Sequence, residues 1–347
     1  MNVIRIRKAI LYGAGDLRIE EEFYDPSTLK PTEVLVRTAA TGFSTGTDLA
    51  NYQGRSTEVP GAPDYPRAVG YSNVGMVAAA GGTVRSLQPG DRVFSAKPHR
   101  SAYTAEESEV LVRLPASVET DQASLGYLVH LGIAALRQVR YEAGENVAVV
   151  GLGVIGLCTV AAARAMGARV IGVANDPNRA ALARRVGALD TYLSGDPSFN
   201  GNPSSVFEGH GADIVVLTAN TWQAYRDSME MVRHAGRVSV LGFPGRAQPA
   251  PGFNPLEARW LYGKQLTITG TGHISSVDCA SSDIRFNLRR NLEYVFDLMS
   301  SGNLNLEPVI SHRFSYDRMR EAYELAQQHS KQFSAAVFDW RAAHMGE

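Results

Sequence analysis

The stretch VAVVGLGVIGL constrains the fold of this chain more than any other. Gly151, Gly153 and Gly156 follow an apolar run typical of a buried strand and stand at the head of a helix-length segment. Glycines at this spacing allow a tight turn, the approach of a pyrophosphate to bare backbone, and close packing of helix on strand. The N–H groups at the start of the helix, around Val154 and Ile155, would face the phosphates. We therefore predict a dinucleotide site.

Strand-like and helix-length segments alternate on the C-terminal side of residue 127. In order they read NVAVVGLG, VIGLCTVAAARAMGA, RVIGVAND, PNRAALARRVGA, ADIVVLTAN, WQAYRDSMEMVRHA and GRVSVLGF. Such alternation implies right-handed βαβ units and a parallel sheet covered on both faces. The sequence therefore predicts the α/β class, with a Rossmann doubly wound parallel sheet.

The first 125 residues or so have a different pattern, with short strand-like runs such as VIRIRKAIL, EVLVRTAA and DRVFSA separated by turn residues. After LTITGTG come two further helix-like and strand-like pairs, which form too long a tail to be a cap on the sheet. We predict that this tail returns to the first unit. The expected domains are a β catalytic domain, 1–126 and 273–347, and a Rossmann dinucleotide-binding domain, 127–272.

Composition excludes several classes of partner. Lys+Arg 34 against Asp+Glu 35 gives a net charge of −1, without the basic excess that binding to nucleic acid needs. No apolar run reaches the ~18 residues of a membrane span, and the N-terminus MNVIRIRKAILYG has no signal-peptide pattern. The only cysteines, Cys158 and Cys279, are far apart, which favours a reducing compartment. We expect a cytoplasmic protein that binds neither nucleic acid nor membrane.

The segment RVIGVANDPNR bears on the choice between NAD and NADP. A carboxylate at the end of the second strand normally bonds the ribose 2′-OH, and its absence leaves room for a 2′-phosphate. If Asp176 reaches the ribose, NAD is expected; if Ala174 holds that position, Asn175 and Arg179 would accept a phosphate. Asp176 is equally well interpreted as the N-cap of the next helix. Both interpretations stay open, with NADP as first choice and NAD as second.

A second segment, TGFSTGTDLANYQG (41–54), carries hydroxyls, glycines and one carboxylate but neither cysteine nor histidine. With PRAVGYSNVGMV, LQPGDRV, VAVVGLGVIGL and GRVSVLG in this order, the chain resembles the medium-chain dehydrogenase/reductase superfamily over essentially its full length. The resemblance implies a chaperonin-like (GroES-like) catalytic domain joined to the Rossmann domain, an NAD(P)-dependent oxidoreductase that acts on a small-molecule substrate, and a homodimer or homotetramer.

Zinc-dependent members of that family carry G-I-C-G-T-D-x-H, then G-H-E, then a third ligand before the Rossmann glycines. Here the cysteine position falls on Thr45, the histidine on Tyr71, and the third ligand near Gly126 or Tyr127. These residues do not form a zinc-binding set, because zinc prefers thiolate, imidazole or carboxylate. The segment HRSAYTAEES, where relatives hold a structural zinc, also lacks cysteine. We predict no bound metal.

The resemblance also implies catalytic roles. Thr47 matches the hydroxyl that relays a proton to the substrate oxygen, with a turn-forming hydroxyl as the alternative; Asp48 matches the acid that braces the loop. Tyr71 either donates its phenol to the substrate or only fills the former metal position. His130 maps to a position that faces the nicotinamide, where it is either a proton donor or a packed helix residue.

Further cofactor contacts are implied at Thr45, Thr218, Leu241, Gly242 and Thr271, each at a loop or strand end. Lys331 either reaches the pyrophosphate or is a solvated lysine. The segment HISSVDCASSDIRFNLRRN (273–291) is a candidate specificity loop. Its Arg285, Arg289 and Arg290 favour either an acidic substrate or a solvated helix face.

The predicted function is transfer of hydride between the nicotinamide and a secondary alcohol or ketone in the cleft between the domains, without zinc. FSTGTD is similar to the S-T-G-T-[DE] loop of a zinc-free branch whose members resemble dehydrogenases of bacteriochlorophyll precursors. The alternative is NADPH-dependent reduction of an enone or quinone C=C bond. An alternative of another class is a dinucleotide-binding sensor or structural protein without turnover.

Overall fold

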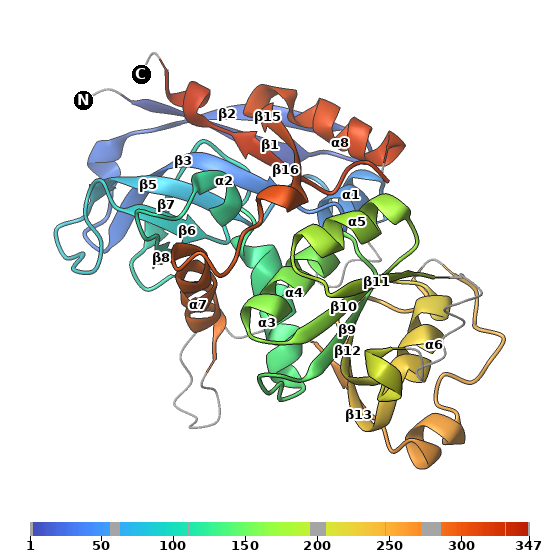
Figure 1. Cartoon of the computed structure of the whole chain (residues 1–347). Helices are drawn as coiled ribbons and strands as arrows, with labels where there is room; N and C mark the ends of the chain where they lie inside the picture. The colour runs from blue at the N-terminus through green and yellow to red at the C-terminus, as the bar shows by residue number, and fades with distance from the viewer. Residues whose placement is uncertain are drawn as a thin grey trace. The chain divides into compact units, whose positions relative to one another are not determined.

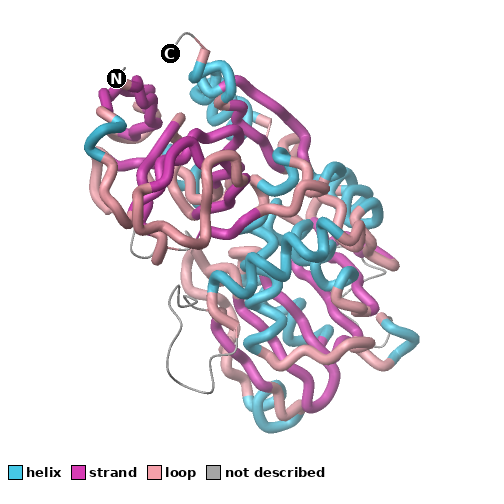
Figure 2. The backbone as a smooth tube through the Cα atoms, turned by 90° about the vertical axis from the view of Figure 1, so that its left-hand side faces the viewer, coloured by secondary structure: helices cyan, strands magenta, loops and turns pink. Residues whose placement is uncertain are grey.

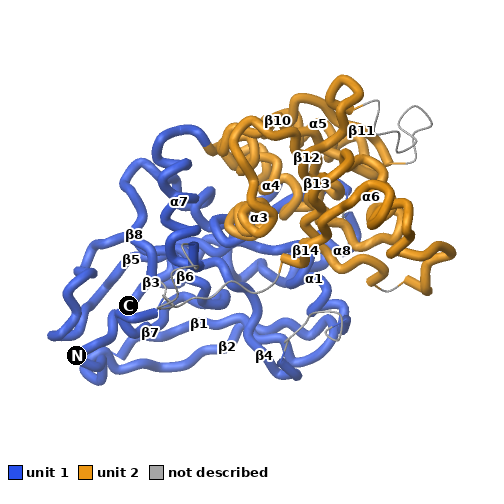
Figure 3. The backbone as a smooth tube through the Cα atoms, turned by 90° about the horizontal axis from the view of Figure 1, so that it is seen from below, with its two compact units in different colours: residues 1–128, 275–303, 310–347 blue, residues 129–274, 304–309 orange. Residues whose placement is uncertain are grey.

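The computed structural model describes residues 3–55, 63–109, 111–194, 206–246, 248–271, 286–329 and 331–345. The chain divides into two compact units, one of residues 1–128, 275–303 and 310–347 and the other of residues 129–274 and 304–309 (Figure 3). Cys279, Arg285 and most of the candidate specificity loop lie outside the described residues.

The second unit is built on a parallel sheet that, within the described residues, has the strand order β11-β10-β9-β12-β13-β14 (Figure 1). Its strands are β9 (Asn146–Val150), β10 (Arg169–Ala174), β11 (Asp190–Leu193), β12 (Ala212–Leu217), β13 (Val232–Val240) and β14 (Thr267–Gly270). The sheet runs outward from β9 in both directions, so right-handed crossovers place the intervening helices on opposite faces. The predicted Rossmann domain is confirmed.

Helices connect these strands as the alternating pattern predicts. They are α4 (Val154–Ala165), α5 (Pro177–Arg185) and α6 (Trp222–Met231), while α3 (Gly126–Gln138) leads into the sheet (Figure 2). The strands that they cover are apolar on both faces, since β9 buries Val147, Ala148, Val149 and Val150. Such runs are typical of strands buried on both sides.

The end of α6 differs from the prediction. WQAYRDSMEMVRHA was expected to be helical throughout, but α6 ends at Met231 and Val232 already belongs to β13. Lys264 explains the early end, because its Nζ donates to the carbonyls of Met229 (2.9 Å), Glu230 (2.8 Å) and Val232 (3.0 Å). A cation that binds the last carbonyls terminates a helix favourably.

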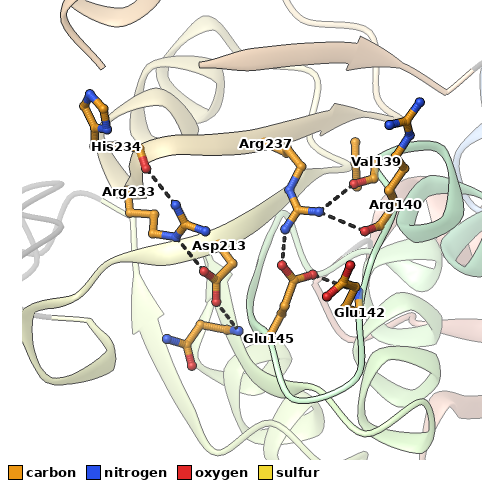
Figure 4. Close-up of polar contacts among 9 residues, drawn as sticks. Val139, Arg140, Glu142, Glu145, Asp213, Arg233, His234 and Arg237 are labelled. Atoms are coloured by element: carbon orange, nitrogen blue, oxygen red, sulfur yellow. Dashed lines mark hydrogen bonds and ion pairs between the residues drawn. The ribbon is translucent and has the colours of Figure 1, made fainter. Parts of the chain in front are cut away.

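The amino-terminal edge of this sheet is held by charged side chains (Figure 4). Asp213 accepts from the backbone N–H of Asn146 (2.7 Å) and from Arg233 (2.5 Å). Arg237 pairs with Glu145 and donates to two carbonyls at the end of α3. The ion pairs of this group thus join the beginnings of β9, β12 and β13, at the edge opposite the glycine turn.

The first unit is mostly antiparallel β-structure. Its larger sheet has the order β15-β16-β3-β5-β6-β8 with β7 also paired to β3, and a smaller sheet has the order β2-β1-β4. The strands are β1 (Ile4–Leu11), β2 (Leu17–Tyr24), β3 (Glu33–Phe43), β4 (Arg67–Ala68), β5 (Asn73–Ala80), β6 (Arg92–Ser95), β7 (Ala102–Glu106), β8 (Leu111–Arg113), β15 (Ile310–Ser315) and β16 (Ala335–Asp339). The helices are α1 (Thr47–Tyr52), α2 (Thr120–Ala123), α7 (Leu288–Ser300) and α8 (Met319–Gln328).

The C-terminal tail forms part of this unit's sheet. Strand β16, red in Figure 1, pairs antiparallel with β3, so that Ala336 lies opposite Phe43. Phe43 packs against the rings of Tyr323 (centroids 4.5 Å apart), Phe333 (5.7 Å) and Phe338 (5.9 Å). This aromatic core lies directly behind the loop that begins at Ser44. Among the helices of the described residues, none is long and apolar enough to cross a membrane.

Candidate functional site

The glycine turn connects β9 to α4, and two of its glycines cannot be replaced. Gly151 has φ +97°, and a Cβ there would lie 2.7 Å from the backbone nitrogen of Ala219. A Cβ on Gly156 would lie 1.9 Å from the carbonyl oxygen of Gly151. These two residues therefore serve the tight turn and the packing of helix on strand.

Gly153 is different, because no atom lies within 4 Å of the place where its Cβ would be. It is the N-cap of α4 and makes no side-chain capping bond, so the first N–H groups of the helix, including those of Val154 and Ile155, lack a capping side chain. Open space beside the N-terminus of a helix fits a pyrophosphate. The structure therefore suits this turn to a dinucleotide.

Other predicted cofactor residues meet at the carboxyl edge of the same sheet. The Thr218 hydroxyl donates to the carbonyl of Gly151 (2.5 Å). The N–H groups of Leu241 and Gly242 both donate to the carbonyl of Leu217, at 2.9 and 2.8 Å, and the N–H of Thr271 donates to Val240 (2.9 Å). This edge, where the strand order reverses beside β9, is where open α/β sheets bind ligands.

The end of β10 distinguishes the two interpretations of Asp176. Ala174 is the last residue of the strand and Asn175 is exposed. Asp176 is buried and caps α5, accepting from the N–H groups of Asn178 (2.9 Å) and Arg179 (3.4 Å). The N-cap interpretation of Asp176 is thus the one that the structure shows.

Arg179 lies next to the glycine turn. Its guanidinium donates to the carbonyl of Leu152 (3.0 Å), between the first two glycines. Burial lowers the pKa of Arg179, and the nearby Asp176 carboxylate opposes that shift. The side chain remains a cation, since an arginine pKa is far above neutrality.

In the first unit, Asp48 joins the loop to the strand region that follows it. Its carboxylate accepts from the N–H of Ser44 (3.0 Å) and from the N–H of Gly70 (3.2 Å). The side chain is buried, and desolvation raises its pKa to about 6, opposed by these two hydrogen bonds. Gly70 is itself confined, since a Cβ there would lie 2.5 Å from the ring of His99. The bracing role predicted for Asp48 has a direct geometric counterpart.

Tyr71 and Thr47 lie together beside this brace. Desolvation and the Asp48 carboxylate raise the pKa of Tyr71, whereas hydrogen bonding by the hydroxyls of Ser44 and Thr47 lowers it. The phenol therefore stays protonated over the physiological range, with two hydroxyls in its immediate surroundings. A neutral phenol of this kind can donate a hydrogen bond to an oxygen that gains negative charge.

Tyr71 also packs against Tyr127, with ring centroids 5.1 Å apart and an interplanar angle of 67°. The resemblance assigned one metal-ligand position to Tyr71 and another to Gly126 or Tyr127. Two phenol rings in edge contact now occupy that region. Phenols in this protonated state are poor zinc ligands, so the residues present do not fit a catalytic zinc. In the described part of the chain, no group of three His, Cys, Asp or Glu side chains could hold a metal.

His130 follows Tyr127 by three residues on α3, so the two occupy neighbouring positions on the helix surface. It is buried, and desolvation lowers its pKa to about 4, with a smaller contribution from Arg137. The imidazole is therefore neutral at physiological pH. This environment agrees with a packed helix histidine, and any donated hydrogen bond would come from a neutral ring.

Arg289 and Arg290, which the sequence offered as contacts for an acidic substrate, contact protein groups instead. Arg289 donates to the carbonyls of Leu111 and Glu109, both at 2.8 Å, which ties α7 to β8. Arg290 lies over the ring of Phe286. Lys331 is exposed, which agrees with a solvated lysine. These arginines thus give no support to an acidic substrate.

Sequence reasoning missed two hydroxyls of this site, those of Ser44 and Tyr323. Both are buried, and neither oxygen makes a hydrogen bond of normal geometry. Ser44 adjoins the FSTGTD motif and was within reach of the sequence argument. The sequence could not have identified Tyr323, because it lies on the apolar face of α8, where its pattern is the same as that of any aromatic core residue.

The fold and the glycine turn define a two-unit α/β protein with a dinucleotide-binding sheet. Two family models match its sequence: the alcohol dehydrogenase GroES-like domain at residues 30–136 and the zinc-binding dehydrogenase model at residues 154–285. The chain belongs to the medium-chain dehydrogenase/reductase superfamily of NAD(P)-dependent oxidoreductases.

Individual relatives agree with this assignment. The chain is 26% identical over 326 residues to the alcohol dehydrogenase notN of Aspergillus sp. (strain MF297-2), covering 81% of this chain and 91% of that protein. An Escherichia coli oxidoreductase/dehydrogenase of unknown specificity has a similar structure, with TM-score 0.80, 20% identity and coverage of 97% and 99%. A Sinorhizobium meliloti 1021 protein described as a zinc-binding dehydrogenase and bound to NADP has TM-score 0.76, 20% identity and coverage of 97% and 99%.

Proposed function

We propose that this protein transfers hydride between a nicotinamide cofactor, NADP before NAD, and a secondary alcohol or its ketone, without a catalytic zinc. The observation that carries the proposal is the grouping of Tyr71 and Thr47 around the Asp48 brace, with Tyr127 against Tyr71 where zinc-dependent relatives would hold the metal. When bound, the cofactor supplies or accepts the hydride at its nicotinamide ring.

The protein's own part in the reaction is to hold the substrate oxygen and move its proton. Negative charge develops on that oxygen during reduction, and preorganised donors stabilise it. Tyr71 is one such donor and Thr47 a second, because the Thr47 hydroxyl is near enough to the phenol to lower its pKa. A metal contributes several kcal/mol by polarising the carbonyl, and in its absence the hydrogen bonds of these two donors would offset part of that contribution. The buried, neutral His130 has a positioning role in this proposal.

The preference for NADP follows from the end of β10. Ala174 stands where NAD-dependent enzymes have a carboxylate, and the Asp176 carboxylate is occupied as a helix cap. Exposed Asn175 and the guanidinium of Arg179 would then receive the 2′-phosphate. The buried carbonyl contact of Arg179 keeps its side chain near the glycine turn.

Parallel fluorescence titrations with NADPH and NADH, on protein assayed for metal content, test the cofactor and zinc parts of this proposal. We expect the lower Kd for NADPH and far less than one zinc per chain. Turnover against matched pairs of secondary alcohols, enones and quinones tests the reaction. Oxidation of alcohols supports the proposal, whereas activity confined to enones would support C=C reduction. Binding without any turnover would favour a sensor, and one zinc per chain would overturn the metal-free mechanism.

Two further proposals concern assembly and location. Strand β14 pairs with β13 and, among the described strands, has no partner on its other side, which suits it to extend the sheet into a second copy in a homodimer or homotetramer. Light scattering of the purified protein tests this.

The second proposal is a location in the cytoplasm. Cys158 is a buried thiol, and burial raises its pKa to about 12, which is in keeping with a reducing compartment.

A further inference from the structure

The first unit buries two hydroxyls at its aromatic core. Ser44 Oγ and the Tyr323 phenol oxygen are both buried and make no hydrogen bond of normal geometry, although the Ser44 hydroxyl lies close enough to the Tyr71 phenol to lower its pKa. Buried polar groups in folded proteins are paired with protein or with ordered water, so each of these two hydroxyls is expected to have a partner outside the protein.

Contacts among the surrounding residues bring these two hydroxyls toward Asp48. Tyr323 packs on Phe43, the residue before Ser44, with centroids 4.5 Å apart, and on Tyr52 at 5.1 Å. Tyr52 follows Asp48 by four residues on α1, so the two share one face of the helix. The Tyr323 ring therefore covers the side of α1 that carries Asp48.

Electrostatics support the same grouping. Burial raises the pKa of Tyr323, and the Asp48 charge and Tyr71 raise it further. The Asp48 carboxylate also raises the pKa of Tyr71, while Ser44 lowers it. Each Asp48 oxygen accepts one backbone N–H, and a carboxylate oxygen can accept a second hydrogen bond.

We propose that Ser44, Asp48 and Tyr323 enclose one ordered water and, with Tyr71, form a buried proton store for the reaction. The inference rests on the proposed function and assigns Ser44 and Tyr323 as positioning residues. The water would receive or donate hydrogen bonds at Ser44 Oγ, the Tyr323 oxygen and one Asp48 oxygen. Three polar partners are what a buried water typically has.

Oxidation of an alcohol releases one hydride and one proton. When bound, NAD(P)⁺ would accept the hydride of the alcohol C–H bond, and the alcohol proton passes to the Tyr71 oxygen as the carbonyl forms. In the same movement the Tyr71 proton passes to Ser44 Oγ, the Ser44 proton to the water, and a water proton to the Asp48 carboxylate, which becomes neutral. Reduction of a ketone reverses each transfer, so no tyrosinate is formed.

The first test is a crystal structure of the purified full chain at a resolution that shows ordered water. We expect a water within hydrogen-bonding distance of Ser44 Oγ, the Tyr323 oxygen and Asp48. This measurement does not depend on turnover. A dry site, or new hydrogen bonds that satisfy both hydroxyls within the protein, would overturn the proposal even if the enzyme is active.

The second test uses Ser44→Ala and Tyr323→Phe, which remove only the two orphaned oxygens. Tyr24→Phe is the matched control, because Tyr24 also has a buried phenol oxygen without a partner and lies on β2. For a secondary alcohol we expect kcat to fall about tenfold in both test variants and not in the control, less than the loss of a group that itself exchanges a proton with the substrate. The Kd for NADPH should stay unchanged. Test variants as active as the control would overturn the proton store.

The third test follows the Asp48 carboxyl by carbon-13 NMR in protein labelled at aspartate. Loss of the water would desolvate Asp48 further, so its pKa should rise by about one unit in Ser44→Ala and Tyr323→Phe but not in Tyr24→Phe. Equal titration in all three variants would overturn the shared water. A different result would be an Asp48 pKa that shifts in the two test variants, and a crystal structure that shows the water, in a protein whose wild type oxidises no alcohol. This result would overturn the proposed function and the storage role but would leave the water site in place.

Discussion

The rings of Tyr71 and Tyr127 meet with centroids 5.1 Å apart and planes inclined at 67°. In this geometry the positive edge of one ring faces the other ring's electron-rich face, which stabilises such pairs by about 0.5–1.5 kcal/mol beyond burial. One ring comes from the turn before β5 and the other from α3. The contact places aromatic rings at positions to which the family resemblance assigns zinc ligands.

The Tyr71 hydroxyl should matter for rate more than for folding. Tyr71→Phe keeps the ring contact with Tyr127 and removes the proposed donor. We expect kcat/KM for a secondary alcohol to fall about 100-fold, comparable to the loss of one oxyanion donor. Tyr103→Phe is the control, since its hydroxyl bonds Ser95 within β-structure. Equal activity of the two variants would show that Tyr71 only fills space.

Gly153 and Gly156 should respond differently to the same substitution. A Cβ on Gly153 meets no protein atom within 4 Å, so Gly153→Ala should keep the wild-type Tm while it weakens NADPH binding about tenfold, or 1.4 kcal/mol. A Cβ on Gly156 would overlap the Gly151 carbonyl, so Gly156→Ala should lower Tm as well. Calorimetry with cofactor titration separates the two effects. Unimpaired NADPH binding by folded Gly153→Ala would argue against a pyrophosphate at this turn.

Asn175→Asp tests the cofactor preference. Asn175 is exposed after β10, and a carboxylate of the same size would repel a 2′-phosphate without altering the fold. We expect the Kd for NADPH to rise about tenfold and that for NADH to change little, as expected for one added like charge near a phosphate. Asn175→Ser serves as the neutral control. A parallel change in both Kd values would mean that residue 175 does not contact the 2′-position.

Asp48 should make stability depend on pH. Its pKa is raised to about 6 in the folded state, so the folded protein binds the proton more tightly than the unfolded chain does. The stabilisation present at low pH is lost as pH rises through about 4 to 6, by up to about 2.7 kcal/mol for two pKa units. Urea unfolding at pH 4.5 and pH 7 measures this loss. Asp48→Asn should reduce the difference, and an unchanged difference would contradict a desolvated carboxylate.

Much of the fold was predictable because local patterns and tertiary structure agree. The alternation of apolar strands with helix-length segments predicted the parallel, doubly wound sheet that β9 to β14 form, and the glycine spacing agrees with the φ of Gly151 and the close contact at Gly156. The end of α6 was not predictable, because Lys264 lies more than thirty residues along the chain and reaches the last carbonyls only in the folded state.

The sequence by itself determined the Rossmann sheet and the glycine turn, because each depends on residue type and spacing. It also determined that the loop around Thr45 contains neither cysteine nor histidine. Only the tertiary structure decided that Asp176 caps α5, that Tyr71 meets Tyr127, and that the hydroxyls of Ser44 and Tyr323 are buried without a partner in the protein. Such contacts join residues far apart along the chain. Their energies depend on which groups are desolvated together, which periodicity and propensity do not encode.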